Sequence, residues 1–227
     1  MNEDKNVIAY YTKNEKGRDF VCGDIHGCFD ELENALESID FNKECDRMFC
    51  VGDLIDRGPR SYDALKYYYK DWFYTVQGNH ENMFSTHFAR YNKTYIHYDF
   101  ENGTEWSRKQ SYEYLCELWE ATHNLPLIIK VDDTLILHAR LPRKVDNLEI
   151  IEANPQKYRE TILWERDGVP AKIRIPEIKR VYCGHSIVKK PFEYNASINI
   201  DTGAFLTHWG KAGKLTIVDL QDGSFVY

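Results

Sequence analysis

The fold of this chain is decided by three short segments: Gly23-Asp24-Ile25-His26-Gly27, Gly52-Asp53-Leu54-Ile55-Asp56-Arg57-Gly58 and Gly78-Asn79-His80-Glu81. Each segment directly follows an apolar, strand-like run, and the runs cover 19–22, 47–51 and 72–76. Helical spacing fills the intervals at 29–39 and 61–69, and a further helical stretch covers about 81–91. This β-α-β-α-β order predicts a largely parallel sheet with right-handed crossovers.

Polar side chains gather at the carboxyl ends of these strands, where ligands bind in open α/β sheets. We expect six of them around one crevice: Asp24, His26, Asp53, Asp56, Asn79 and His80. Carboxylate, imidazole and amide donors without a thiolate suit Mn²⁺, Fe²⁺ or Zn²⁺. Asp24 and His26 lie two apart on a segment expected to be extended, so they should point the same way and share one ion. Asp53 follows the middle strand, and its carboxylate can bridge two ions.

The second half of the chain has short β-branched runs separated by Gly, Asp or Asn, which predict a second, more antiparallel sheet. The runs cover 126–131, 134–138, 180–184, 196–200, 214–219 and 224–227. Helical segments are expected near 146–152 and 155–163. His138 ends one of the runs and His185 directly follows another, so there are enough donors for two metal sites. The polar and aromatic stretch 92–124 is interpreted as a mostly helical insertion.

Length and composition place further limits on the protein. With 227 residues, 43% hydrophobic and 29% charged, the chain suits one soluble domain covering 1–227. Its net charge of −7 argues against nucleic acid or an anionic membrane as a partner. No apolar run is long enough to span a bilayer, and the N-terminal segment is polar. We therefore expect the protein in the cytoplasm. Six cysteines without a C-x-x-C pair are expected as free thiols.

The spacing of the three segments resembles that of the calcineurin-like metallophosphoesterases: GDIHG, 24 residues, GDLIDRG, 19 residues, GNHE. Within that superfamily, the GDLIDRG form is similar to the serine/threonine phosphoprotein phosphatase family, and the chain length resembles the small bacterial and phage lambda enzymes. The stretch 198–204 (INIDTGA) also looks like a family segment. The resemblance implies a four-layer α-β-β-α fold, in which helices flank a central β-sandwich.

The resemblance also implies roles for individual residues. Asp24, His26 and Asp53 would bind the first metal ion, and Asp53, Asn79, His138 and His185 the second. His80 would be the general acid, oriented by Asp56, while Arg57 and Arg166 would hold the phosphate. The implied activity is that of a phosphomonoesterase, most simply a serine/threonine protein phosphatase, with two divalent ions (Mn²⁺ first, Fe²⁺ or Zn²⁺ as alternatives). A hydroxide between the ions would attack phosphorus in a phosphorylated protein or small phosphate ester.

Two other functions stay open at this stage. A dinucleoside tetraphosphate hydrolase of the same superfamily shares GDxHG and GNH but usually has a small residue in place of Asp56. A catalytically inactive binding module would have gaps among the ligands, and the sequence shows none. One departure from the family pattern is Arg140, where glycine is usual; we expect it to point into solvent in preference to contacting phosphate. Part of the insertion is also a candidate cap over the crevice.

Overall fold

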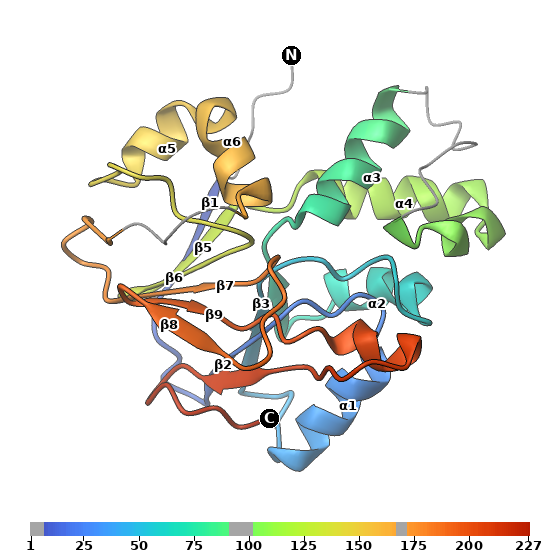
Figure 1. Ribbon diagram of the computed structural model, residues 1–227, viewed down its shortest axis with the longest axis horizontal. Coiled ribbons are helices and arrows are strands. Elements are labelled where there is room, and N and C mark those ends of the chain that lie inside the picture. The colour runs from blue at the N-terminus through green and yellow to red at the C-terminus, as the bar shows by residue number, and fades with distance from the viewer. Residues whose placement is uncertain (1–6, 91–101, 167–171) are drawn as a thin grey trace.

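The computed structural model describes residues 7–90, 102–166 and 172–227. Two β-sheets face each other, and helices cover the outer face of each (Figure 1). This arrangement confirms the predicted four-layer α-β-β-α fold.

The first sheet has the strand order β10-β2-β3-β4. Its strands are β2 (Asp19–Cys22), β3 (Arg47–Cys50), β4 (Phe73–Thr75) and β10 (Ile217–Asp219). The pairs β2·β3 and β3·β4 are parallel, as predicted, and β10 adds an antiparallel edge. Because Cys22 pairs with Cys50 and Cys50 with Thr75, the three segments that follow these strands leave the sheet at one edge.

The second sheet has the order β1-β5-β6-β7-β9-β8. Its strands are β1 (Ile8–Tyr11), β5 (Ile128–Val131), β6 (Thr134–Leu137), β7 (Arg180–Cys183), β8 (Phe192–Tyr194) and β9 (Ser197–Asn199). The sequence predicts a more antiparallel sheet here, and the observed sheet is mixed: β1·β5, β6·β7 and β7·β9 are parallel, while β5·β6 and β8·β9 are antiparallel. The strand predicted at 224–227 is reduced to one bridge from Phe225 to Val218.

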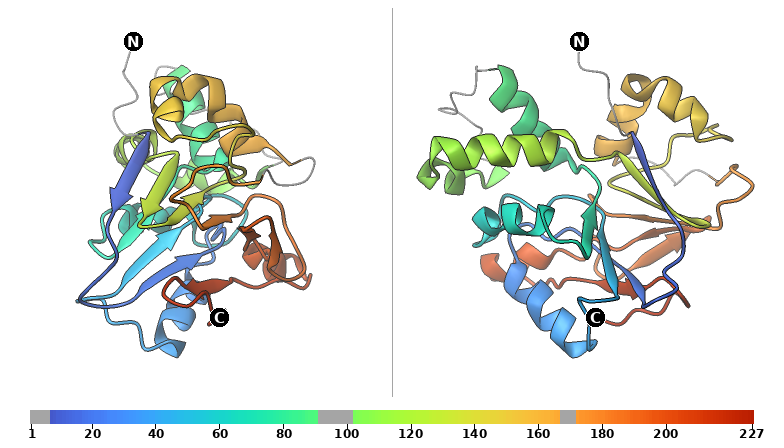
Figure 2. Two further views of the ribbon diagram at one scale, coloured as in Figure 1. Left: turned by 90° about the vertical axis from the view of Figure 1, so that its left-hand side faces the viewer. Right: turned by 180° about the vertical axis from the view of Figure 1, so that it is seen from behind.

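The helices lie in two groups on opposite outer faces (Figures 1 and 2). The first group comprises α1 (Phe29–Ser38), α2 (Ala64–Tyr68, preceded by the 3₁₀ turn η1, Ser61–Asp63), α3 (Asn79–Arg90) and α4 (Tyr112–His123). The second group comprises α5 (Glu149–Ala153) and α6 (Pro155–Trp164). Two further 3₁₀ turns are η3 (Glu105–Lys109) and η4 (Ala204–Trp209). The predicted insertion at 92–124 is helical where it is described, in η3 and α4, and 91–101 lie outside the described residues.

Strand alternation explains the layers. On β2 and β3, Phe20 and Met48 pack outward against the first helix group, while Val21 and Phe49 point between the sheets. Successive strand residues face opposite sides of a sheet, so a continuous apolar run supplies both cores. The inner core contains residues of both sheets, including Ile136 of β6, and this apolar layer holds the two sheets together.

Candidate active site

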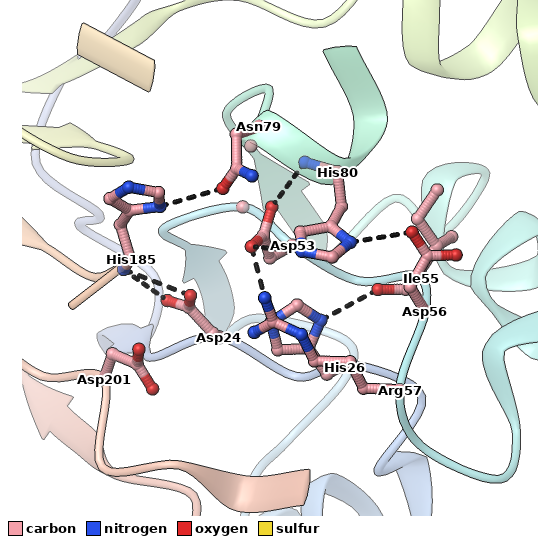
Figure 3. Close-up of polar contacts among 12 residues, drawn as sticks. Asp24, His26, Asp53, Ile55, Asp56, Arg57, Asn79, His80, His185 and Asp201 are labelled. Atoms are coloured by element: carbon pink, nitrogen blue, oxygen red, sulfur yellow. Dashed lines mark hydrogen bonds and ion pairs between the residues drawn. The ribbon is translucent and has the colours of Figure 1, made fainter. Parts of the chain in front are cut away.

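Asp53 stands at the centre of a buried cluster of imidazoles at the end of the sandwich (Figure 3). Its Oδ2 lies 3.4 Å from Nε2 of His26, 3.5 Å from Nε2 of His138 and 3.9 Å from Nε2 of His80. Burial alone would raise the pKa of Asp53, but the surrounding His138 and His80 hold it well below its usual range. This carboxylate is therefore ionised and touches residues from both sheets.

Asn79, His138 and His185 meet on one side of Asp53. Oδ1 of Asn79 lies 2.8 Å from Nε2 of His138 and 2.8 Å from Nδ1 of His185, and the two rings approach to 3.1 Å. Donor atoms that share an ion at about 2.0–2.2 Å lie roughly 3 Å from one another. The four side chains therefore fit one divalent cation, with Asp53 as the shared member.

Three imidazoles are oriented by backbone carbonyl groups. Nδ1 of His26 contacts the carbonyl of Ile55 at 2.9 Å, and Nδ1 of His138 contacts that of Val51 at 2.8 Å. His185 uses Nε2 toward the carbonyl of Trp164, at 3.2 Å. A carbonyl accepts the ring proton and leaves the lone pair of the other nitrogen facing the site, which is how proteins prepare histidine as a metal ligand.

The fourth imidazole, His80, has a carboxylate where the others have a carbonyl. Its Nδ1 lies 2.7 Å from Oδ2 of Asp56, and its buried Nε2 has no hydrogen-bond partner among the described residues. Burial alone would lower the pKa of His80, but the charges of Asp53 and Asp56 outweigh it and raise that pKa. Burial lowers the pKa of His26 and His138 instead. His80 is thus the ring best suited to carry a proton near neutral pH.

Asp24 lies beside the cluster, next to His185. Its carboxylate accepts the backbone N–H of His185, at 3.1 Å and 3.3 Å, and Asp201 is its neighbour (Figure 3). Burial, together with the charges of Asp201 and Asp53, raises the pKa of Asp24 well above its usual range. Two trios of donor groups that lie within 4.8 Å of one another include Asp53 within the described residues: His26 with Asp53 and His80, and Asp53 with His138 and His185. Asp24 is in neither of them. Its role as a ligand stays a prediction.

Several residues of the cluster have left-handed backbone. The segment after β2 is not extended at His26, where φ is +46°. Asp53, Asp56, Arg57 and His185 also have left-handed backbone, with φ between +54° and +71°. Such conformations cost about 1–3 kcal/mol each outside glycine and cluster at functional sites. The alternation assumed from the sequence does not hold in this segment.

Glu81 anchors the loop that carries Asp53, a role that the sequence did not reveal. Its Oε2 accepts the N–H groups of Asp53 and Gly78, both at 2.9 Å, and its Oε1 accepts that of Leu54 at 2.8 Å. The hydroxyl of Tyr68 also donates to Oε1, at 3.2 Å. One buried carboxylate thus satisfies backbone donors that the tight turn after β3 would otherwise leave unpaired.

The insertion reaches the site and contacts Asp56 and Arg57. Nε1 of Trp106 donates to Oδ1 of Asp56 at 2.8 Å, so the carboxylate holds His80 on one oxygen and the indole on the other. The carbonyl of Gly103 accepts the N–H of Arg57 at 3.0 Å. A Cβ at Gly103 would lie 2.6 Å from that nitrogen, so only glycine fits there. Part of the insertion therefore lies against the site, and Trp106 is a contact that sequence reasoning missed.

The predicted phosphate-binding arginines lie at the same end of the sandwich. Nη1 of Arg57 lies 2.7 Å from Nε2 of His26, and its guanidinium sits over the ring of Phe205. Nη1 of Arg166 donates to the carbonyl of His185 at 2.7 Å. Arg140 does not point into solvent as expected, because its Nη2 donates to the carbonyl of Arg166 and its Nη1 is buried.

Comparison with known proteins identifies the family. The family model for calcineurin-like phosphoesterases matches residues 20–196. The chain is 29% identical over 216 residues to serine/threonine-protein phosphatase 1 of Salmonella typhimurium, covering 89% of this chain and 91% of that protein. It is 45% identical over 64 residues to the symmetrical bis(5'-nucleosyl)-tetraphosphatase of Shewanella sp., covering 27% of this chain and 23% of that protein.

A solved structure supports the fold. A protein named provisionally as a diadenosine tetraphosphatase superposes with a TM-score of 0.68 at 22% identity, covering 96% of each chain. At that identity the likeness concerns the fold alone. The family model covers most of the chain and includes all three segments that form the buried cluster. The chain belongs to the calcineurin-like phosphoesterase family, whose members are metal-dependent hydrolases with a dinuclear metal centre.

Proposed function

We propose that this protein is a phosphomonoesterase with two divalent ions, Mn²⁺ foremost, that acts on phosphoserine and phosphothreonine in proteins. The resemblance over 89% of the chain to a serine/threonine-protein phosphatase supports the substrate class. We further propose that residues 1–227 form one domain that acts in the cytoplasm. Within the described residues no helix is long and apolar enough to span a membrane.

The observation that carries the proposal is the contrast among the four imidazoles. Three of them contact a carbonyl through one nitrogen and turn the other nitrogen toward the site, while His80 contacts Asp56 and is stabilised as a cation. Metal binding alone does not need a protonated imidazole that is held by a buried carboxylate. Proton donation to a leaving group requires that arrangement.

The residues then divide into roles. Asp24, His26 and Asp53 would hold one ion, and Asp53, Asn79, His138 and His185 the other. When bound, the two ions activate water and neutralise charge on the phosphoryl group. Arg57 and Arg166 would bind the phosphoryl oxygens, because a guanidinium matches two of them at once. His80 would pass the proton on its Nε2 to the departing serine or threonine oxygen, and Asp56 stabilises the ring while it is charged.

The strongest second candidate is hydrolysis of dinucleoside tetraphosphates. It is favoured by the 64-residue match to a symmetrical tetraphosphatase. Asp56 argues against it, because the residue is in direct contact with His80 here, whereas those enzymes usually have a small residue at that position. An inactive binding module is disfavoured because every proposed ligand type is present.

A direct assay separates these functions. Metal-free protein is reconstituted with Mn²⁺ and offered a phosphoserine peptide, p-nitrophenyl phosphate and diadenosine tetraphosphate at equal concentrations. We expect phosphate release from the first two and little cleavage of the dinucleotide. Faster release of ADP from the dinucleotide would overturn the proposal in favour of the second candidate. Inertness on all three substrates with two ions bound per chain would point to a binding module.

A further inference from the structure

A second group of metal-binding residue types lies outside the cluster around Asp53. Cys28 directly precedes α1, Glu31 lies in the first turn of α1, and His208 belongs to η4. One donor atom from each side chain lies within 4.8 Å of the other two. The red turn η4 runs beside the blue helix α1 in Figures 1 and 2, so segments far apart in the sequence bring these residues together.

The geometry of this group suits a small divalent cation. Oε1 of Glu31 lies 3.3 Å from Nε2 of His208. Two donor atoms that bind the same zinc ion at about 2.0–2.1 Å in a tetrahedral arrangement lie roughly 3.3 Å from each other. Oε2 of Glu31 is buried and has no hydrogen-bond partner among the described residues. Buried carboxylate oxygens are almost always paired, and a cation bound between these three side chains would give this atom a partner.

We propose that Cys28, Glu31 and His208 form a third divalent-metal site, which takes a thiolate-preferring ion such as Zn²⁺. Thiolate, imidazole and carboxylate together select Zn²⁺ over Mn²⁺, Mg²⁺ or Ca²⁺. Three protein ligands leave the fourth tetrahedral position to water.

The site lies next to residues proposed to act on substrate. Cys28 is two residues after His26, and η4 also carries Phe205. The ring of Phe205 lies 5.0 Å from the ring of His26 and 4.8 Å from the guanidinium carbon of Arg57. An ion held between α1 and η4 would fix Phe205 against both. The site itself does not rest on the proposed function.

The test uses Co²⁺ as an optical probe on the full-length, metal-free protein. Cobalt bound to a thiolate gives a sulfur-to-cobalt charge-transfer band in the near ultraviolet, and a centre built only from carboxylate, imidazole and amide donors gives none. We expect the wild-type protein to show this band and excess Zn²⁺ to remove it. The readout requires no activity, so its failure is distinct from failure of the proposed phosphatase function.

Three variants make the assignment specific. Cys28→Ser should abolish the band, and the matched variant Cys116→Ser, at a half-buried thiol on α4, should retain it. His208→Asn, at a partly exposed position, should weaken cobalt binding at that band by at least about tenfold, since loss of even an outer partner of a ligand costs about 10–100-fold. A wild-type protein without the band overturns the proposal, as does a band that survives in folded Cys28→Ser or is unchanged in His208→Asn.

Discussion

Replacing Trp106 by phenylalanine tests whether the insertion takes part in catalysis. The substitution keeps a ring in the half-buried position and removes the N–H that donates to Oδ1 of Asp56 at 2.8 Å. A hydrogen bond to a charged group contributes about 1.5–3 kcal/mol. Burial already raises the pKa of Asp56, and loss of a donor raises it further, so Asp56 is protonated more often and holds His80 less firmly. Since each 1.36 kcal/mol is tenfold in rate, we expect kcat to fall roughly 10- to 100-fold.

The assay compares two leaving groups with the same protein. On a phosphoserine peptide the departing alkoxide needs a proton from His80, so the full loss should appear in kcat with little change in KM. On p-nitrophenyl phosphate the leaving group is a weak base, and the loss should be several-fold smaller. The matched control is Trp119→Phe, which removes a 3.0 Å bond from an indole in the same insertion to the carbonyl of Ser85.

Three results would refute this reasoning. Equal losses on the two substrates would mean that the substitution disturbs the fold or the metals and leaves proton donation unaffected. A Trp119→Phe variant as impaired as Trp106→Phe would mean that the insertion acts only by packing. Finally, in an Asp56→Asn background Trp106→Phe should cost nothing further, and a full additional loss would show that the indole does not act through Asp56.

Further predictions address the rest of the cluster. His80→Asn should lower kcat by about 10²–10⁴-fold while two ions per chain remain bound, and loss of metal by elemental analysis would show that His80 is a ligand. Glu81→Gln places an amide among backbone donors and should lower the free energy of unfolding by about 3 kcal/mol in urea titrations and weaken metal binding; an unchanged midpoint would contradict the anchoring role. Burial, opposed by the N–H of Gly203, raises the pKa of Asp201 to about 6 from 3.8. At Asp201 the folded metal-free protein therefore holds a proton that the unfolded chain has lost, so the contribution of this residue to stability should decline as pH rises from about 4 to about 6. The difference in unfolding free energy between the wild-type protein and Asp201→Asn should shift in that direction across this pH range, and a difference that does not change with pH would contradict the prediction.

The sequence predicted those features that depend on periodicity and on segment order. The apolar runs before Gly23, Gly52 and Gly78 define β2, β3 and β4, and parallel pairing brings their following segments to one edge. His138 and His185 were predicted from the ends of apolar runs, and the structure places both within 3.5 Å of other cluster members. In the second sheet the sequence pattern predicted where strands occur along the chain but not whether neighbouring strands are parallel or antiparallel. A short β-branched run has the same composition in either kind of pair.

Other features depend on backbone conformation that local composition does not specify. The backbone at His26 is left-handed, whereas spacing alone predicted an extended segment from Asp24 to His26. Trp106 donates a hydrogen bond to Asp56, which lies 50 positions away in the sequence, and no local sequence pattern predicts such a contact. Glu81 belongs to the segment Gly78-Asn79-His80-Glu81, but its carboxylate accepts backbone N–H groups. The sequence alone does not distinguish such a structural glutamate from one that binds a metal ion. The direction of Arg140 was misjudged because its acceptor is a backbone carbonyl of Arg166.

The position of the cluster between the two sheets would make the supply of metal a determinant of how much folded protein persists. Asp53 and Asn79 follow strands of one sheet, while His138 and His185 follow strands of the other. An ion bound by all four would link sheets that are otherwise held by the apolar inner layer. Because ligand binding to the native state adds to its stability by mass action, chains made under metal starvation should turn over faster than chains made in plenty. The amount of folded protein would then depend on metal availability even in the absence of substrate.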